Sequence, residues 1–257
     1  MAYVDPMNAG LLDAYLICAT PRTGSSLLCG LLESTGVGGH PESYFRQPDE
    51  QTWAARWGLL LSSDGHFSYA DFVQAAIAAG STENGVFAAR IMWGTLEEVI
   101  DRLGKVYRDL VGADLDLLNR ALGLTRFVYL RRDDVVAQAV SWLRAEQTNL
   151  WHEDDRFRQE HPVQMPHFDL EEIRRLVRLI NEHNEAWQDW FSSVGITPHL
   201  VRYEDLAADP VSVTGSTLDY LGLALPRGHE IRARHRRLAD DLNAEWIDRY
   251  RNATREA

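Results

Sequence analysis

Short apolar blocks alternate with amphipathic stretches along most of the chain, and polar turns separate them. The first block, Ala14–Ala19, is an uninterrupted apolar run, as expected for a strand that is buried on both faces of a sheet. Three later blocks also predict strands: Gly85–Met92, Arg126–Leu130 and His199–Tyr203. Between them, apolar residues at helical spacing predict helices, the longest of them over Leu170–Phe191.

The remaining predicted helices fall between and after the strands. One begins near Ser25, and the others span Tyr69–Ala79, Leu96–Leu103, Leu115–Leu122, Val135–Gln147, Val211–Leu221 and part of the tail at Glu245–Arg251. Strands that alternate with helices predict an α/β fold in which a mostly parallel sheet is flanked by helices. A chain of 257 residues can bury one sizeable core, so we expect a single domain over residues 1–257.

Three segments lack a clear period. Residues 36–45 contain three glycines and a proline, which predict a loop at the carboxyl side of the sheet. Residues 46–68 are aromatic and polar, and we expect an irregular excursion or lid on the substrate side. His152–His167 is polar, contains two prolines and predicts a further loop.

The acidic composition excludes several classes of function. A net charge of −12 argues against a broad nucleic-acid-binding face. The sequence holds no apolar run long enough to cross a membrane, and its first residues do not resemble a secretion signal, so we expect a cytoplasmic protein. Cys18 and Cys29 are most simply interpreted as buried free thiols, and no Cys/His cluster in the sequence suggests a metal site.

The turn after the first predicted strand is the first candidate site. It reads Thr20-Pro21-Arg22-Thr23-Gly24 and leads into Ser25 and Ser26, which are good N-cap residues for the following helix. Such a turn directs backbone N–H groups and the positive end of the helix dipole at one point, which suits a phosphate or sulfate. The alternative is an ordinary strand-to-helix turn. The turn has no Walker lysine, which disfavours a nucleoside triphosphatase or a kinase.

A second candidate site follows the strand Arg126–Leu130. Arg132 leaves the strand, and Ser141 lies nine positions later on the next helix, so a turn that folds back can bring both to one phosphate. The alternative is a polar helix start, in which Asp133 or Asp134 favours the helix dipole. The chain has 25 arginines but a single lysine, so an arginine outside a motif is weak evidence for anion binding.

Seven segments, which follow one another along nearly the whole chain, carry a resemblance to a known family. They are Tyr15–Leu28 (YLICATPRTGSSLL), Gly36–Phe45 (GVGGHPESYF), Gly85–Trp93 (GVFAARIMW), Arg132–Ser141 (RDDVVAQAVS), Arg144–Trp151 (RAEQTNLW), Arg202–Leu206 (RYEDL) and Glu245–Arg251 (EWIDRYR). In this order they resemble the sulfotransferases that use 3′-phosphoadenosine 5′-phosphosulfate (PAPS), and most closely the bacterial trehalose 2-sulfotransferase family.

The resemblance implies a donor site and a reaction. The turn Arg22–Ser26, with Thr23, Gly24 and Ser25, would hold the 5′-phosphosulfate, and Arg132 with Ser141 would hold the 3′-phosphate. The tail near Arg237 and Asn243 would close over the nucleotide. The reaction implied is in-line transfer of a sulfuryl group to a hydroxyl of a carbohydrate, with Arg22 stabilising the leaving phosphate and with no metal. The resemblance also suggests a homodimer.

The acceptor hydroxyl needs a general base, because its own pKa lies far above neutral. The candidates are Glu42 and His40, of which we prefer Glu42. The resembled family carries glutamates at the positions of His40 and Ser43, the second as its base, so the acceptor of this chain can differ from trehalose. Arg90 stands where that family carries a lysine. The alternative function is a PAPS-binding protein of the same fold with impaired catalysis.

Overall fold

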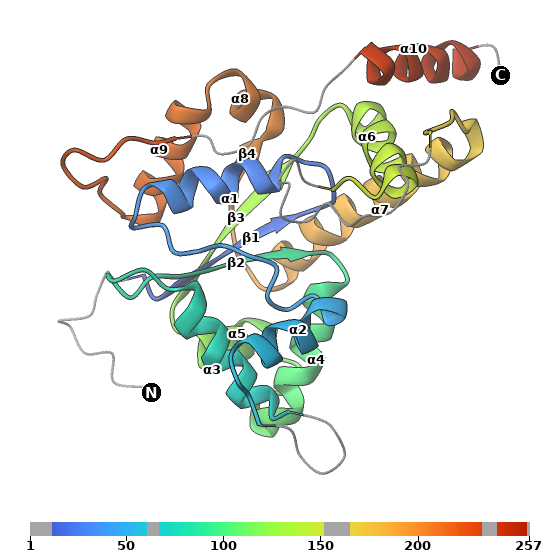
Figure 1. Cartoon of the computed structure of the whole chain (residues 1–257). Coiled ribbons are helices and arrows are strands. Elements are labelled where there is room, and N and C mark those ends of the chain that lie inside the picture. Colours follow the sequence, from blue (N-terminus) through green and yellow to red (C-terminus); the bar gives the residue numbers. More distant parts are fainter. Residues whose placement is uncertain (1–11, 61–66, 152–164, 233–240, 256–257) are drawn as a thin grey trace.

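A four-stranded parallel sheet forms the centre of the computed structural model, which describes residues 12–60, 67–151, 165–232 and 241–255. The strand order is β2-β1-β3-β4 (Figure 1). The strands span Ala14–Ala19 (β1), Phe87–Met92 (β2), Thr125–Arg131 (β3) and His199–Arg202 (β4). All four predicted strands are therefore confirmed, with ends that differ by one or two residues.

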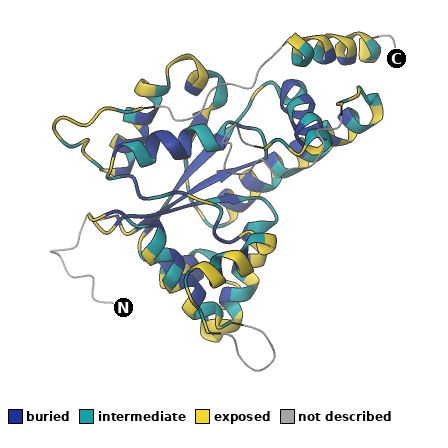
Figure 2. Ribbon diagram, viewed as in Figure 1, coloured by how far each residue is buried: buried dark blue, intermediate teal, exposed yellow. Residues whose placement is uncertain are grey.

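The side chains of β1 alternate between two apolar layers, because successive residues of a strand point to opposite faces. Tyr15 and Ile17 pack with residues of α1 (Ser25–Ser34) and α9 (Pro210–Leu221). Leu16 and Cys18 pack on the opposite face, with buried residues of the helices over Tyr69–Gly80, Thr95–Val106, Asp114–Leu122 and Leu170–Ser193. All six residues of β1 are buried, and Figure 2 shows the strands at the centre of the sheet mostly in the dark blue of buried residues. The expected fold class, a parallel sheet flanked by helices, is confirmed.

The predicted helices are present, with small shifts at their ends. Those not yet labelled are α3 (Tyr69–Gly80), α4 (Thr95–Val106), α5 (Asp114–Leu122), α6 (Val135–Thr148), α7 (Leu170–Ser193) and α10 (Asp241–Arg255). A 3₁₀ turn, η1, spans Arg108–Leu110, and β4 is followed directly by α8, Tyr203–Ala208, which the sequence analysis assigned in part to the strand. Asp134, Asp169 and Asp209 cap their helices by accepting a backbone N–H three residues on.

The expectation of an irregular segment over residues 46–68 is wrong in its first half. Residues Gln47–Arg56 form the helix α2, which begins with Pro48 in its first turn. Trp53 and Trp57 stack on each other with ring centroids 5.4 Å apart, and both contact the ring of Tyr44. The helix is therefore held by aromatic packing on a neighbouring loop, which a search for apolar periodicity does not detect. Residues 61–66 lie outside the described part of the chain.

Both cysteines are buried free thiols, as expected. Burial raises the pKa of Cys18 well above its ordinary value and that of Cys29 to about 12, so neither is an activated thiolate. Among the described helices, none combines the length and the hydrophobicity that a membrane crossing requires. The predicted loop over His152–His167 lies mostly outside the described residues, because these resume at Met165.

Candidate anion-binding site

The candidate site lies at the carboxyl ends of β1 and β3. The two strands pair in parallel, with Ala19 opposite Leu130, so the turn after β1 and the segment after β3 leave the same edge of the sheet side by side. Arg22 lies in the turn after β1 with a φ of +67°, which is uncommon for any residue other than glycine. Gly24 has a φ of +83° and precedes α1 as its cap.

The turn and α6 are joined by a direct hydrogen bond. Arg22 Nε donates to Ser141 Oγ at 3.0 Å, and Arg22 Nη1 donates to the carbonyl of Trp151 at 2.7 Å. Arg132 Nη1 donates to the carbonyl of Arg22 at 3.4 Å, and its guanidinium lies over the ring of Tyr203, 4.4 Å from the centroid. The structure therefore brings the two sequence motifs together at one place, where Arg22 of the first motif contacts Arg132 and Ser141 of the second.

The positive charge of this region is concentrated. Burial, and then repulsion from the nearby Arg132 guanidinium, hold the pKa of Arg22 below its ordinary value, and Arg144 lowers it further. The guanidinium of Arg22 is charged, because arginine keeps its proton in proteins. Burial and like charges destabilise a cation, and an anion placed beside that cation stabilises it. The arrangement therefore favours an anionic ligand at this edge of the sheet.

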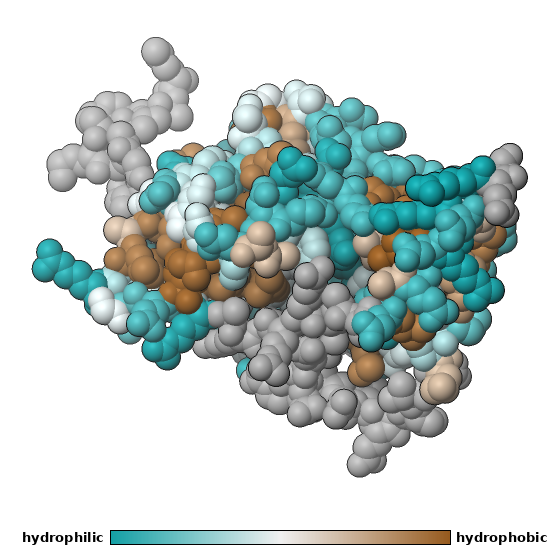
Figure 3. Space-filling model, turned by 90° about the horizontal axis from the view of Figure 1, so that it is seen from above, coloured by the Kyte–Doolittle hydropathy of each residue, from teal (hydrophilic) through white to brown (hydrophobic). Residues whose placement is uncertain are grey.

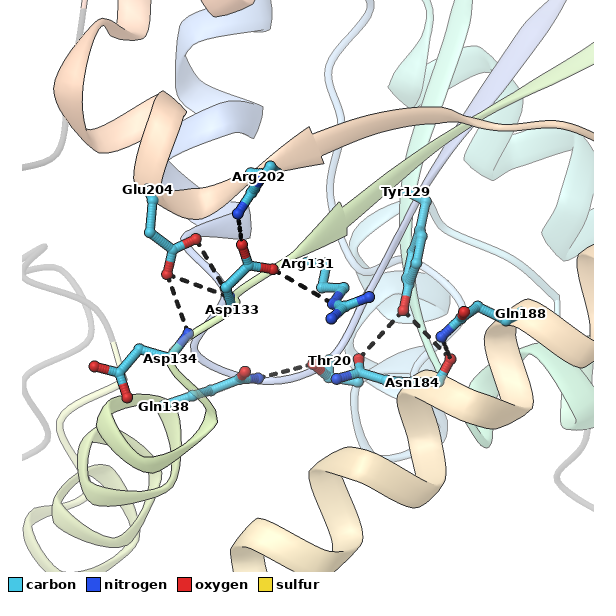
Figure 4. A network of polar contacts seen from close by, with 10 residues as sticks. All are labelled: Thr20, Tyr129, Arg131, Asp133, Asp134, Gln138, Asn184, Gln188, Arg202 and Glu204. Atoms are coloured by element: carbon cyan, nitrogen blue, oxygen red, sulfur yellow. Dashed lines mark hydrogen bonds and ion pairs between the residues drawn. The ribbon is translucent and has the colours of Figure 1, made fainter. Parts of the chain in front are cut away.

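Gln138 is a residue of this site that the sequence analysis did not single out. It is fully buried on α6, and its Nε2 donates to Thr20 Oγ1 at 2.8 Å, as Figure 4 shows. The same Nε2 donates to the Pro21 carbonyl at 2.7 Å. These two bonds fix the start of the turn to α6, ahead of the unusual backbone of Arg22. A glutamine among the alanines and valines of a helix start, three residues before Ser141, was the available signal in the sequence.

Acidic side chains beside the site are engaged by the polypeptide itself. Asp133 forms ion pairs with Arg131, at 3.6 Å, and with Arg202. Glu204 accepts the backbone N–H groups of Asp133 and Asp134, at 3.2 and 3.3 Å (Figure 4). The alternative of a capped polar helix start is therefore also correct, since Asp134 caps α6. Capping and the clustering of arginines occur together in this segment.

The two serines at the start of α1 do not act as the predicted caps, because the cap position is Gly24. Their hydroxyls accept hydrogen bonds from Arg90 on β2, at 2.9 Å to Ser26 Oγ and 3.4 Å to Ser25 Oγ. Arg90 Nε also donates to Ser43 Oγ at 2.9 Å, and the Arg90 backbone N–H donates to the carbonyl of Glu42 at the same distance. Arg90 thus connects the loop of residues 36–45 with the start of α1.

The two candidate bases, Glu42 and His40, make different contacts in the structure. Glu42 bridges to β2 beside Ala89 and is exposed, one residue from Ser43, which Arg90 joins to Ser26. His40 Nδ1 instead pairs with Glu33 Oε1 at 3.2 Å, near the end of α1. Glu33 is seven residues beyond Ser26, which is roughly 10 Å along a helix. The backbone of Glu42 therefore lies beside Arg90, which also bonds Ser26, whereas the His40 ring pairs near the other end of α1.

The tail reaches the site through α10. Asn243 Oδ1 accepts from Arg144 Nη1 at 2.6 Å, and Arg251 pairs with Asp134 at 2.9 Å. Trp246 and Tyr250 are buried in the apolar cluster that α10 forms with α6 and α7. In the view from above (Figure 3), hydrophilic residues cover much of the described surface, with hydrophobic patches between them. Arg237 lies outside the described residues.

Comparisons with known proteins identify the family to which the sequence is similar. The family model described as Stf0 sulphotransferase matches residues 14–253. A protein of Mycolicibacterium smegmatis named trehalose 2-sulfotransferase is 30% identical over 93% of this chain and 94% of its own. A Mycobacterium tuberculosis protein of the same name is 28% identical over 92% and 94%. A sulfotransferase domain from the curacin biosynthetic pathway superposes with a TM-score of 0.47 at 17% identity, covering 85% of this chain and 76% of that domain.

Gly24 provides a test of the turn's geometry. A Cβ atom at this position would lie 2.7 Å from Tyr203 Cδ2, in addition to the cost of a φ of +83°. We expect Gly24→Ala to lower the free energy of unfolding by about 1–3 kcal/mol. Gly215→Ala is the matched control, because it lies within α9 and a Cβ there meets open space; it should be neutral or stabilise by about 0.4–1 kcal/mol. Denaturant unfolding compares the two, and equal stabilities would contradict the described turn.

Proposed function

Since this chain belongs to the Stf0 sulphotransferase family, we propose that it transfers a sulfuryl group from PAPS to a hydroxyl of a carbohydrate. The observation that carries the proposal is the hydrogen bond between Arg22 and Ser141, which joins the two predicted phosphate-binding motifs. Two anionic groups of one nucleotide can then be bound at once, the 5′-phosphosulfate at Arg22–Ser26 and the 3′-phosphate at Arg132 and Ser141. Asn243, held by Arg144, closes the site from the tail.

The transfer follows an in-line course. The acceptor oxygen forms a bond to sulfur while the bond from sulfur to the bridging oxygen breaks, and the electron pair of that bond stays on the phosphate. Negative charge therefore grows on the bridging oxygen, where Arg22 and the N–H groups at the start of α1 stabilise it. Positioning and electrostatics are expected to supply most of the rate, as in phosphoryl transfer. The donor is a co-substrate, and this course requires no metal.

Glu42 is the proposed general base, which takes the proton of the acceptor hydroxyl as the new bond forms. Its carbonyl accepts the backbone N–H of Arg90, whose side chain donates to Ser26 at the end of the donor turn. A serine at position 43 cannot accept this proton unaided. The relatives are named for trehalose, so a trehalose-like sugar is the first acceptor that we propose.

A transfer assay tests the proposed function. The purified protein is incubated with sulfur-labelled PAPS and a panel of sugars that includes trehalose, and the label is followed into product. We expect labelled sulfate ester with at least one sugar. Binding of the nucleotide without transfer to any hydroxyl compound would instead support the alternative, a PAPS-binding protein with impaired catalysis.

Arg132 is expected to recognise the 3′-phosphate. Arg132→Ala should weaken binding of adenosine 3′,5′-bisphosphate by about 1.5–3 kcal/mol, because it removes a charge-assisted contact at a half-buried position. The loss should be much smaller for adenosine 5′-phosphosulfate, which lacks the 3′-phosphate. Calorimetric titration measures both. The exposed Arg120, substituted by alanine, serves as the control, and equal losses for the two nucleotides would show that Arg132 does not read this group.

Glu42→Gln should lower turnover about a hundred- to ten-thousand-fold, because it preserves size but removes basicity. Nucleotide affinity should stay nearly unchanged, since the donor site uses other residues. His40→Asn is the matched variant on the same loop and should retain most of the turnover. If the large loss instead follows His40→Asn, with an acidic limb of the pH–rate profile near the pKa of histidine, His40 is the base.

A further inference from the structure

The turn after β1 is held through its carbonyl groups. Each of the four consecutive backbone carbonyls from Ala19 to Arg22 accepts a hydrogen bond from a side chain. The donors, in the order of the carbonyls, are Trp187 Nε1 at 3.1 Å, Thr23 Oγ1 at 2.9 Å, Gln138 Nε2 at 2.7 Å and Arg132 Nη1 at 3.4 Å. Three of these side chains belong to other parts of the chain, on α7, on α6 and after β3. The conformation of the turn is therefore set largely from outside the turn.

The occupied carbonyls determine where the N–H groups of the turn point. In a planar trans peptide, the C=O and N–H groups of one unit point in opposite directions, and no described peptide bond is cis. The N–H of Arg22 shares a peptide unit with the Pro21 carbonyl and therefore points away from Gln138. Within the described part of the chain this N–H forms no hydrogen bond, and Arg22 is partly exposed. The N–H of Arg22 therefore remains for a ligand.

Gln138 is an unusual residue for its position. It is fully buried near the start of α6, where alanine and valine residues precede and follow it in the sequence. Its Nε2 must be the atom that faces Pro21, because a carbonyl can only accept a hydrogen bond. The other amide atom, Oε1, is shielded from solvent and has no hydrogen-bond partner among the described residues. A buried acceptor without a partner opposes folding, so the two donated bonds account for a glutamine at this position.

We propose that Gln138 is a positioning residue, which holds the Pro21 carbonyl and thereby aims the N–H of Arg22 at the 5′-phosphosulfate of the donor. The inference rests on the proposed function. The side chain of Arg22 is fixed separately, by Ser141 and by the carbonyl of Trp151. Arg22 thus offers a backbone donor and a cation that different contacts hold in place, and Gln138 governs the backbone donor.

Loss of the Gln138 bonds should affect one anionic group of the nucleotide and spare the other. The φ of +67° at Arg22 is unfavourable for a residue with a side chain, so it persists only where surrounding contacts impose it. Without these contacts the turn can relax, and the N–H of Arg22 turns away from the 5′ group. The proposed 3′-phosphate site instead uses the side chains of Arg132 and Ser141. Because negative charge grows on the bridging oxygen during transfer, the loss should lower kcat by more than it raises the KM for PAPS.

The test compares calorimetric titrations with adenosine 3′,5′-bisphosphate and with adenosine 3′-monophosphate, which lacks the 5′ group. Gln138→Met and Gln138→Leu keep a side chain of similar volume and remove the donor. Both should lower the affinity for the bisphosphate about tenfold, as expected for one hydrogen bond to a charged group, and leave that for the monophosphate within about twofold.

Tyr129→Phe is the control for the loss of a buried hydrogen bond. The Tyr129 hydroxyl donates to Asn184 Oδ1 on α7 at 3.3 Å, and not to the turn (Figure 4). This variant should keep both affinities. In the unmodified protein, the amide proton of Arg22 should move downfield in the NMR spectrum when the bisphosphate binds, and much less when the monophosphate binds.

The outcomes separate this inference from the proposed function. A selective loss of bisphosphate affinity in the Gln138 variants, with Tyr129→Phe intact and the Arg22 amide shifted, would support the inference. Equal losses for the two nucleotides, a similar loss in Tyr129→Phe, full affinity in the Gln138 variants or an Arg22 amide that does not shift would overturn it. A protein that shows the selective loss but transfers sulfate to no acceptor would overturn the proposed function and leave the positioning of the 5′ group intact.

Discussion

The parallel pairing of β1 with β3 is the constraint on which the candidate site depends. The pairing sets Ala19 beside Leu130, so the turn after β1 and the helix start after β3 emerge next to each other although more than a hundred residues separate them. The hydrogen bond from Arg22 to Ser141 and the two bonds from Gln138 to the turn then fix their relative position. A slip of the pairing by one residue would separate these groups and turn each side chain of the strand to the other face.

The same geometry has an electrostatic cost. Arg22, Arg132 and Arg144 lie close enough for the last two to lower the pKa of the first, and the backbone of Arg22 adopts an unusual conformation. Clustered cations and local strain of this kind persist when other contacts hold them, here from α6 and Tyr203. An anion placed beside these arginines would offset the repulsion, which supports the proposed nucleotide site.

The fold and the meeting of the two candidate motifs at one edge of the sheet could be predicted from the sequence because each depends on local patterns. The apolar run Ala14–Ala19 and the polar turn after it are complete within a dozen residues. The features that were missed depend on contacts between distant segments. The helix α2 is held by packing of its tryptophans on Tyr44, Ser26 accepts from Arg90 on another strand, and Gln138 reaches a turn 118 residues away. The pairing of His40 with Glu33, which separates the contacts of His40 from those of Glu42, likewise could not be read from the sequence.

The central claim is that Arg22 and Ser141 belong to one nucleotide site. Calorimetric titration with adenosine 3′,5′-bisphosphate in the presence of a chelator tests it most directly. The account predicts one binding site per chain without metal and at least a tenfold loss of affinity in both Arg22→Ala and Ser141→Ala, since each removes a hydrogen bond to a charged group. Absence of heat and of thermal stabilisation in the unmodified protein, or full affinity in either variant, would contradict it.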